Sequence, residues 1–172
     1  SGSECIAMIV KNEQVDYWRQ VETAFRDVCK EKGLKAYFYA TTGDNAYDEQ
    51  VAAVAELRKL GTKVLKGIIF TPSFGLNGES AEAEVAALAK ERGIPVIILD
   101  SPVSAASPLA SYPYFGTDNT AAGKVMAEKV IADKVAVLDN GKMQDVQEKN
   151  DFFKNPKSVS AARLTGCKNI TA

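Results

Sequence analysis

The amino-acid sequence predicts an α/β fold: a doubly wound, flavodoxin-like parallel sheet, followed by a C-terminal hairpin and helix. Apolar, strand-like runs alternate with amphipathic segments over most of the 172 residues. Strands that alternate with helices require right-handed crossovers, which place a parallel sheet between two layers of helices. The apolar runs are also nearly continuous, as expected for strands that are buried on both faces. The length suffices for one domain with a core, or for one domain and an appendage.

Each element of the predicted sheet domain follows from a local pattern. The predicted strands are residues 5–11, 35–41, 66–72, 94–100 and 112–118. The predicted helices are residues 16–34, 48–61, 79–93 and 119–134. In the first helix, a helical period places these residues on one apolar face: Trp18, Val21, Phe25, Val28 and Cys29. Gly33 and Gly61 stand where the first two helices should end.

The C-terminal part of the sequence has a different pattern. Two strand-like stretches, starting with "KVAVL" at residues 134–138, flank Asn140 and Gly141. An Asn-Gly pair between two such stretches is the strongest short signal for a β-hairpin. A helical segment with Phe152 and Phe153 follows. We therefore predict a lobe over residues 4–134 and an appended tail over residues 135–172.

Composition excludes several classes of function. The formal net charge of −1 provides no cationic field for nucleic acid, and no apolar run approaches the roughly 20 residues of a membrane span. The chain has no histidine, the commonest general base and metal ligand. Its three widely spaced cysteines form neither a disulfide framework nor a zinc site. We expect no nucleic-acid partner, no membrane insertion, no metal and no cofactor.

No catalytic motif is present either. The loop after the first strand lacks the G-x-G-x-x-G of dinucleotide-binding folds, and G-x-x-x-x-G-K-[ST] occurs nowhere. A Ser-His-Asp triad requires a histidine, and no G-x-S-x-G elbow is found. We therefore predict a binding module that is not an enzyme.

Polar loops follow the predicted strands, at the edge where open α/β sheets bind ligands. The fourth strand ends on a carboxylate, Asp100, which indicates either a ligand site or only a solvated strand end. Neutral polyols are held by planar polar side chains and by aromatic rings. The candidates of these two kinds are Asn12, Tyr17, Trp18, Asp100, Asp118 and Asn119. The alternative for the aromatic pair places Trp18 in the core and Tyr17 on the surface.

Four stretches in the same order also carry a family resemblance: "IAMIVKNEQVDYWRQVETAF", "KGIIFTPS", "GIPVIILDSPV" and "YFGTDNTAAGKVMAEKV". Together they resemble the N-terminal lobe of ribose-type periplasmic sugar-binding proteins. The related ligand-binding domains of lactose-repressor-type regulators are similar. The resemblance implies that Asn12, Tyr17 and Trp18 touch a sugar and that Asp100 binds its hydroxyls. An arginine often follows that acid in the family, whereas this chain has Ser101.

Residues 135–172 carry a second resemblance. The stretch "ARLTGCKNI" and the hairpin before it resemble the C-terminal part of a molybdate-type ABC importer ATPase subunit. The phosphate loop and signature motif of such ATPases are absent, so no ATPase activity is implied. Three explanations stay open: an engineered or recombined chimera, a fusion by deletion within a transporter operon, or a chance resemblance of a divergent cap.

These observations predict a solute-binding lobe for a sugar or small polyol, from the binding protein of an ABC transporter. The implied partners are the sugar and a transporter permease, with a homodimer through exposed lobe surface as a further expectation. The expected location is periplasmic or extracellular, and cytoplasmic for a regulator domain or a chimera. The alternatives are a scaffold lobe that self-associates without a ligand, and the effector domain of a lactose-repressor-type regulator.

Overall fold

A parallel five-stranded sheet forms the first of two compact units in a computed structural model that describes residues 3–131, 134–139 and 142–158. The first unit is Ser1–Gly116 and the second is Thr117–Ala172. The sheet consists, in spatial order, of β2 (Lys35–Ala40), β1 (Cys5–Val10), β3 (Leu65–Phe70), β4 (Val96–Leu99) and β5 (Tyr114–Phe115). This order is that of a flavodoxin-like doubly wound sheet, which confirms the predicted fold class.

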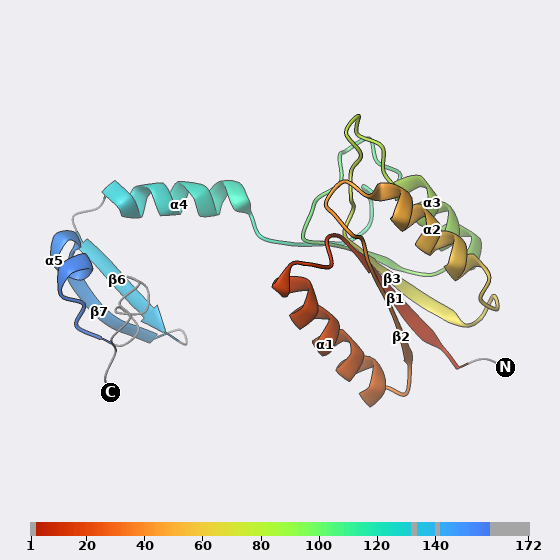
Figure 1. The fold of residues 1–172 in the computed structure, drawn as a ribbon, viewed down its shortest axis with the longest axis horizontal. Coiled ribbons are helices and arrows are strands. Elements are labelled where there is room, and N and C mark those ends of the chain that lie inside the picture. The colour runs from red at the N-terminus through yellow and green to blue at the C-terminus, as the bar shows by residue number, and fades with distance from the viewer. Residues whose placement is uncertain (1–2, 132–133, 140–141, 159–172) are drawn as a thin grey trace. The chain divides into compact units, whose positions relative to one another are not determined.

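Helices cover both faces of this sheet, as Figure 1 shows. One face is covered by α1 (Asp16–Glu31), and the other by α2 (Tyr47–Arg58) and α3 (Glu82–Arg92). Successive side chains of β1 point to opposite faces, so the strand contributes to two separate cores. Cys5, Ala7 and Ile9 pack with residues of α2 and α3. Met8 and Val10 pack with residues of α1.

The first helix buries most of the face that the sequence predicts. Trp18, Phe25 and Cys29 are buried, and Val21 packs partly against them. Val28 is an error of the prediction, since it is 55% exposed. It directly precedes Cys29, so when Cys29 faces the sheet Val28 lies to the side of the contact. The helix ends where Gly33 adopts a left-handed backbone with φ of 70°.

The strands near one edge of the sheet are shorter than predicted. The strand expected at residues 94–100 is limited to β4, and the one expected at 112–118 is limited to the two residues of β5. Both residues of β5 are exposed. Because β5 is an edge strand with one neighbour, β4, few hydrogen bonds extend it.

The second unit contains the predicted hairpin and helix. It begins with α4 (Asn119–Ile131), followed by β6 (Lys134–Asp139), β7 (Lys142–Glu148) and α5 (Lys149–Lys154). The strands β6 and β7 are antiparallel. The turn residues Asn140 and Gly141 and the stretch "ARLTGCKNI" lie outside the described residues. The two compact units divide after Gly116. The predicted boundary at residue 134 separates stretches that resemble two different families, and it stays a prediction.

Candidate functional site

Two residues at the carboxyl edge of the sheet have an unusual backbone conformation. Asn12 follows β1 with φ of 53°, and Asp100 follows β4 with φ of 65°. Among the described residues, they alone have positive φ without being glycine. Asn and Asp adopt this left-handed region more readily than other residues with a side chain, but it still costs free energy. Such conformations concentrate at functional sites. Both residues are predicted site residues.

Two hydrogen bonds to residues of β5 fix the backbone of Asp100. Its N–H donates a hydrogen bond of 2.8 Å to the carbonyl of Phe115. Its carbonyl accepts one of 2.8 Å from the hydroxyl of Tyr114. The hydroxyl of Tyr114 has room because Gly116 has no side chain, since a Cβ there would lie 2.0 Å from it. These two hydrogen bonds therefore fix the backbone from which the Asp100 side chain extends.

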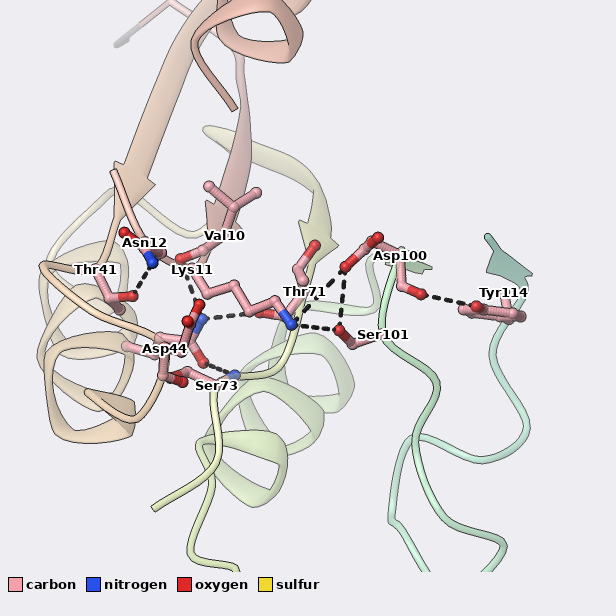
Figure 2. Close-up of polar contacts among 11 residues, drawn as sticks. Val10, Lys11, Asn12, Thr41, Asp44, Thr71, Ser73, Asp100, Ser101 and Tyr114 are labelled. Atoms are coloured by element: carbon pink, nitrogen blue, oxygen red, sulfur yellow. Dashed lines mark hydrogen bonds and ion pairs between the residues drawn. The ribbon is translucent and has the colours of Figure 1, made fainter. Parts of the chain in front are cut away.

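A polar chain links the ends of β1 and β4, as Figure 2 shows. The Lys11 ammonium donates a hydrogen bond of 2.8 Å to the Ser101 hydroxyl. That hydroxyl donates one of 3.1 Å to the Asp100 carboxylate, and the Lys11 Nζ lies 3.9 Å from Oδ2 of Asp100. The two charged side chains are 28% and 42% exposed. The chain thus presents a cation, a hydroxyl and an anion that solvent can still reach.

Lys11 is the residue that the sequence analysis missed. The resemblance implied an arginine after Asp100, and Ser101 stands there instead. The structure brings a cation to Ser101 from a different strand, because Lys11 reaches this hydroxyl from the end of β1. The available signal was a lysine placed directly after a buried apolar run.

Asn12 is held by the loop that follows β2. Its backbone N–H donates a hydrogen bond of 2.9 Å to the Thr41 hydroxyl, which in turn donates one of 2.7 Å to the carbonyl of Gly43. The next residue, Glu13, donates its N–H to the carbonyl of Thr41 at 2.7 Å. The first two loops of this edge are therefore tied together, and the Asn12 side chain is free of these contacts.

The two aromatic candidates differ in environment. Trp18 is 4% exposed and packs in the core on the α1 face of the sheet with Met8 and Phe25. Tyr17 is 49% exposed and meets the Trp18 ring edge-on, with 4.8 Å between ring centroids. This is the arrangement of the alternative expectation, in which Trp18 belongs to the core. Of the pair, Tyr17 is the one with surface to offer a ligand.

Asp118 and Asn119 belong to the second unit. The Asp118 carboxylate accepts a hydrogen bond of 2.8 Å from the N–H of Ala121, which caps the start of α4. Asn119 is the exposed first residue of that helix. The capping bond explains Asp118 without a ligand, and a binding role for both residues stays a prediction.

The site at the edge of the first unit can bind hydroxyl groups. A sugar hydroxyl both donates and accepts, so a pair of neighbouring hydroxyls fits an ammonium that donates and a carboxylate that accepts. Within the described ranges, no three His, Cys, Asp or Glu residues are grouped so as to hold a metal ion. In that same part of the chain, no helix combines the length and the apolar character that a membrane crossing requires.

Solved structures share this fold. GanP, a glucose-galactose binding protein from Geobacillus stearothermophilus, is 25% identical with a TM-score of 0.51, over 76% of this chain and 44% of its own. A carbohydrate transporter solute-binding protein from Agrobacterium radiobacter, in complex with D-arabinose, is 21% identical with a TM-score of 0.57, over 75% and 40%. A protein from Brachyspira murdochii described as "ABC transporter, LacI family transcriptional regulator" is 22% identical with a TM-score of 0.57, over 74% of this chain and 38% of its own.

This chain therefore spans less than half of each of these similar chains. No curated protein matches it. The interpretation of residues 135–172 as the end of an ATPase subunit finds no support in these comparisons, and it stays a prediction.

A family model agrees with the structural similarity. The model described as "Periplasmic binding protein domain" matches residues 6–145. This match covers the parallel sheet except for Cys5, and it continues past the predicted boundary at residue 134 into the hairpin. It confirms the resemblance that the four sequence stretches carry. The chain belongs to the periplasmic binding protein family.

Proposed function

We propose that this chain is a non-catalytic lobe that binds a sugar or small polyol at the carboxyl edge of its sheet. The observation that carries the proposal is the polar chain of Lys11, Ser101 and Asp100. Family membership supports it, and two of the similar structures are sugar-binding proteins. In this proposal Asn12 and Tyr17 complete the contacts, Asn12 through its amide and Tyr17 through its exposed ring.

The proposed mechanism is recognition without chemistry. The Asp100 carboxylate accepts from one hydroxyl of the sugar, and the Lys11 ammonium donates to the next. Because the Ser101 hydroxyl accepts from Lys11 and donates to Asp100, each charged group can keep this hydrogen bond when the sugar binds. Recognition of this kind requires no general base, in agreement with a sequence that lacks histidine.

The affinity of the 172-residue chain should be weak. The match covers only 44% and 40% of the two similar sugar-binding chains, so this chain offers only part of their contact surface. Association has to offset the lost translational and rotational freedom of the sugar, and few contacts remain to do so. We expect a dissociation constant of about 1 mM, which corresponds to about −4 kcal/mol.

The test is a nitrogen–proton correlation NMR titration of the chain with D-arabinose, D-glucose and D-galactose in turn. We expect concentration-dependent shifts at the amides of Lys11, Asn12, Asp100 and Ser101. Asp100→Asn should weaken binding about tenfold, because an amide has one acceptor oxygen instead of two and no charge. Asp27→Asn makes the same chemical change on an exposed part of α1 and should leave the titration unaltered. Equal affinities of the two variants would disprove the site, and absent shifts with all three sugars would disprove the function.

The same proposal includes a transporter context. A solute-binding lobe of this family would work outside the cytoplasmic membrane, in the periplasm or the extracellular space, and would deliver its sugar to an ABC permease. The similarity to a LacI family regulator supports an alternative role for the chain, that of the effector domain of a regulator. A sugar would be the ligand in both cases, so the titration tests both.

A second candidate is self-association of the lobe. The observation that favours it is the edge strand β5, where Phe115 is 59% exposed, beside Ile97, which is 36% exposed. Exposed apolar side chains on a sheet edge favour pairing with another chain. Sedimentation velocity over a range of concentrations measures this, and a monomer at every concentration would remove the candidate.

A further inference from the structure

Gln50 is a fully buried amide in the second helix of the first unit. Its Nε2 donates hydrogen bonds to two carbonyls, that of Val10 at 3.2 Å and that of Thr71 at 2.8 Å. Its Oε1 accepts one of 2.9 Å from the N–H of Ser73. Both donor hydrogens and the acceptor of the amide are therefore in use.

These contacts lie where the sheet ends. The pairing of β1 with β3 extends to Ile9 and Phe70, after which the N–H of Thr71 donates to the carbonyl of Ile9 at 2.8 Å. The next carbonyl of β1, that of Val10, accepts from the N–H of Thr41 at 3.3 Å. Gln50 donates to this carbonyl as well and also to that of Thr71, so its amide bridges the two strand ends where the pairing of β1 with β3 stops.

Burial of this amide costs free energy, which its hydrogen bonds to the strand ends have to offset. A buried amide loses its hydration, and only complete hydrogen bonding offsets this. The residues next to it on the same face of α2, Ala53, Val54 and Leu57, are apolar and pack in the core. An apolar side chain at position 50 would continue that core, but it would remove one of the partners of the Val10 carbonyl and the hydrogen bonds that Gln50 forms with the Thr71 carbonyl and the Ser73 N–H.

We propose that Gln50 is the positioning residue of the sugar site, an inference that rests on the proposed function. It holds the ends of β1 and β3 in place, and the residues that immediately follow Val10 are Lys11 and Asn12. Lys11 has to leave β1 at one angle to reach Ser101, and Asn12 has to adopt its left-handed backbone. In this proposal Gln50 does not contact the sugar. It holds the carbonyl of Val10, the residue that directly precedes Lys11 and Asn12.

The test compares Gln50→Met with Val54→Ala in the full chain. Methionine keeps the length and approximate volume of glutamine but forms none of the three hydrogen bonds. Val54 lies on the same helix, is 1% exposed and packs in the core on the α2 side, so its truncation lowers stability without removing a contact to the strand ends. The two readouts are the backbone chemical shifts of Lys11, Asn12 and Ser73, and the affinity for D-arabinose. The melting temperature of each variant serves as the control, because it measures how much each substitution lowers stability.

We expect Gln50→Met to move the Cα and Cβ shifts of Asn12 away from their left-handed values and to weaken D-arabinose binding about tenfold. Val54→Ala should change neither readout. If both variants weaken binding equally, or if Gln50→Met leaves the shifts of Lys11 and Asn12 unaltered, the proposal is wrong.

The shift readout needs no sugar, so it separates the two proposals. Shifts that move in a chain that binds none of the three sugars would disprove the function while upholding the role of Gln50 at the strand ends. If Gln50→Met does not fold, Gln50→Asn takes its place. That variant keeps the amide but is one methylene too short to reach all three partners, and the same comparison with Val54→Ala applies.

Discussion

The two compact units of this chain differ in how they bury apolar surface. In the first, a parallel sheet is covered on both faces, and two clusters form around it. In the second, the buried cluster among the described residues consists of Val137 and Phe152. Buried apolar area is the main favourable contribution to folding, so the two units should differ strongly in stability.

The difference also explains where a binding site can be built. A site requires side chains held within a fraction of an ångström by rigid elements. The first unit provides such support, since the residues of its site follow strands whose registers are fixed on both sides. In the part of the second unit that the structure describes, β6 and β7 pair only with each other, and the buried apolar cluster is limited to Val137 and Phe152. This difference supports the placement of the proposed sugar site in the first unit.

The largest effect should come from the core of the first unit. Phe70 is fully buried at the end of β3, and Phe70→Ala should lower the free energy of unfolding by about 4 kcal/mol. The large value reflects both the lost transfer free energy and the cavity left between strand and helices. Urea unfolding followed by circular dichroism measures it. A loss below about 1 kcal/mol would show that this core is loosely packed.

A smaller effect is expected from the matching change in the second unit. Phe152 is 4% exposed and packs with Val137, so Phe152→Ala should cost about 2 kcal/mol, because fewer neighbours surround the cavity. Hydrogen exchange should show faster exchange of the β6 and β7 amides, with the amides of β1 and β3 unchanged. Equal acceleration in both sheets would contradict the division into two units of different stability.

A third comparison concerns Asp100, whose backbone is left-handed. Two substitutions there distinguish the effect of losing the carboxylate from the effect of backbone strain. Asp100→Ala and Asp100→Gly both remove the carboxylate, so both should abolish sugar binding. Only glycine adopts φ of 65° without strain, so the glycine variant should be the more stable by about 1 kcal/mol. Thermal unfolding of the pair measures this difference. Equal stability would mean that the strain at this strand end is relieved in the alanine variant.

The smallest effect concerns the loop after β3. The pKa of Glu79 lies below its usual 4.5, because its carboxylate accepts hydrogen bonds from its own N–H and from the side chain and backbone of Asn77. A lowered pKa in the folded state stabilises the loop above pH 4.5, and this contribution is lost as the pH falls through the lowered value. The protection factor of the Asn77 amide, which is its exchange rate relative to an unstructured amide at the same pH, should therefore fall at low pH. In Glu79→Gln that pH dependence should be absent.

Much of the fold could be predicted from the sequence, because it depends on local patterns. The alternation of strand and helix, the continuous apolar runs and the Asn-Gly hairpin are all properties of short segments. The buried face of α1 was correct except at Val28, where the error lies at the margin of a helical stripe. The position of Asp100 at the end of its strand followed from the same reasoning.

The rest depended on contacts between residues far apart in the chain. Periodicity placed Trp18 equally well in a site and in a core, and only the packing of α1 against β1 shows that it is buried, while its contact with a sugar stays a prediction. Lys11 carries no local sign that it reaches a residue 90 positions away. Gln50 looks like one polar residue on a helix until three strand-end groups converge on it. The sequence by itself determined the elements and the edge of the sheet where polar loops gather, because side-chain period and turn chemistry act over a few residues. Only the tertiary structure decided which side chains meet there, because hydrogen bonds between strand ends depend on how the whole sheet is assembled.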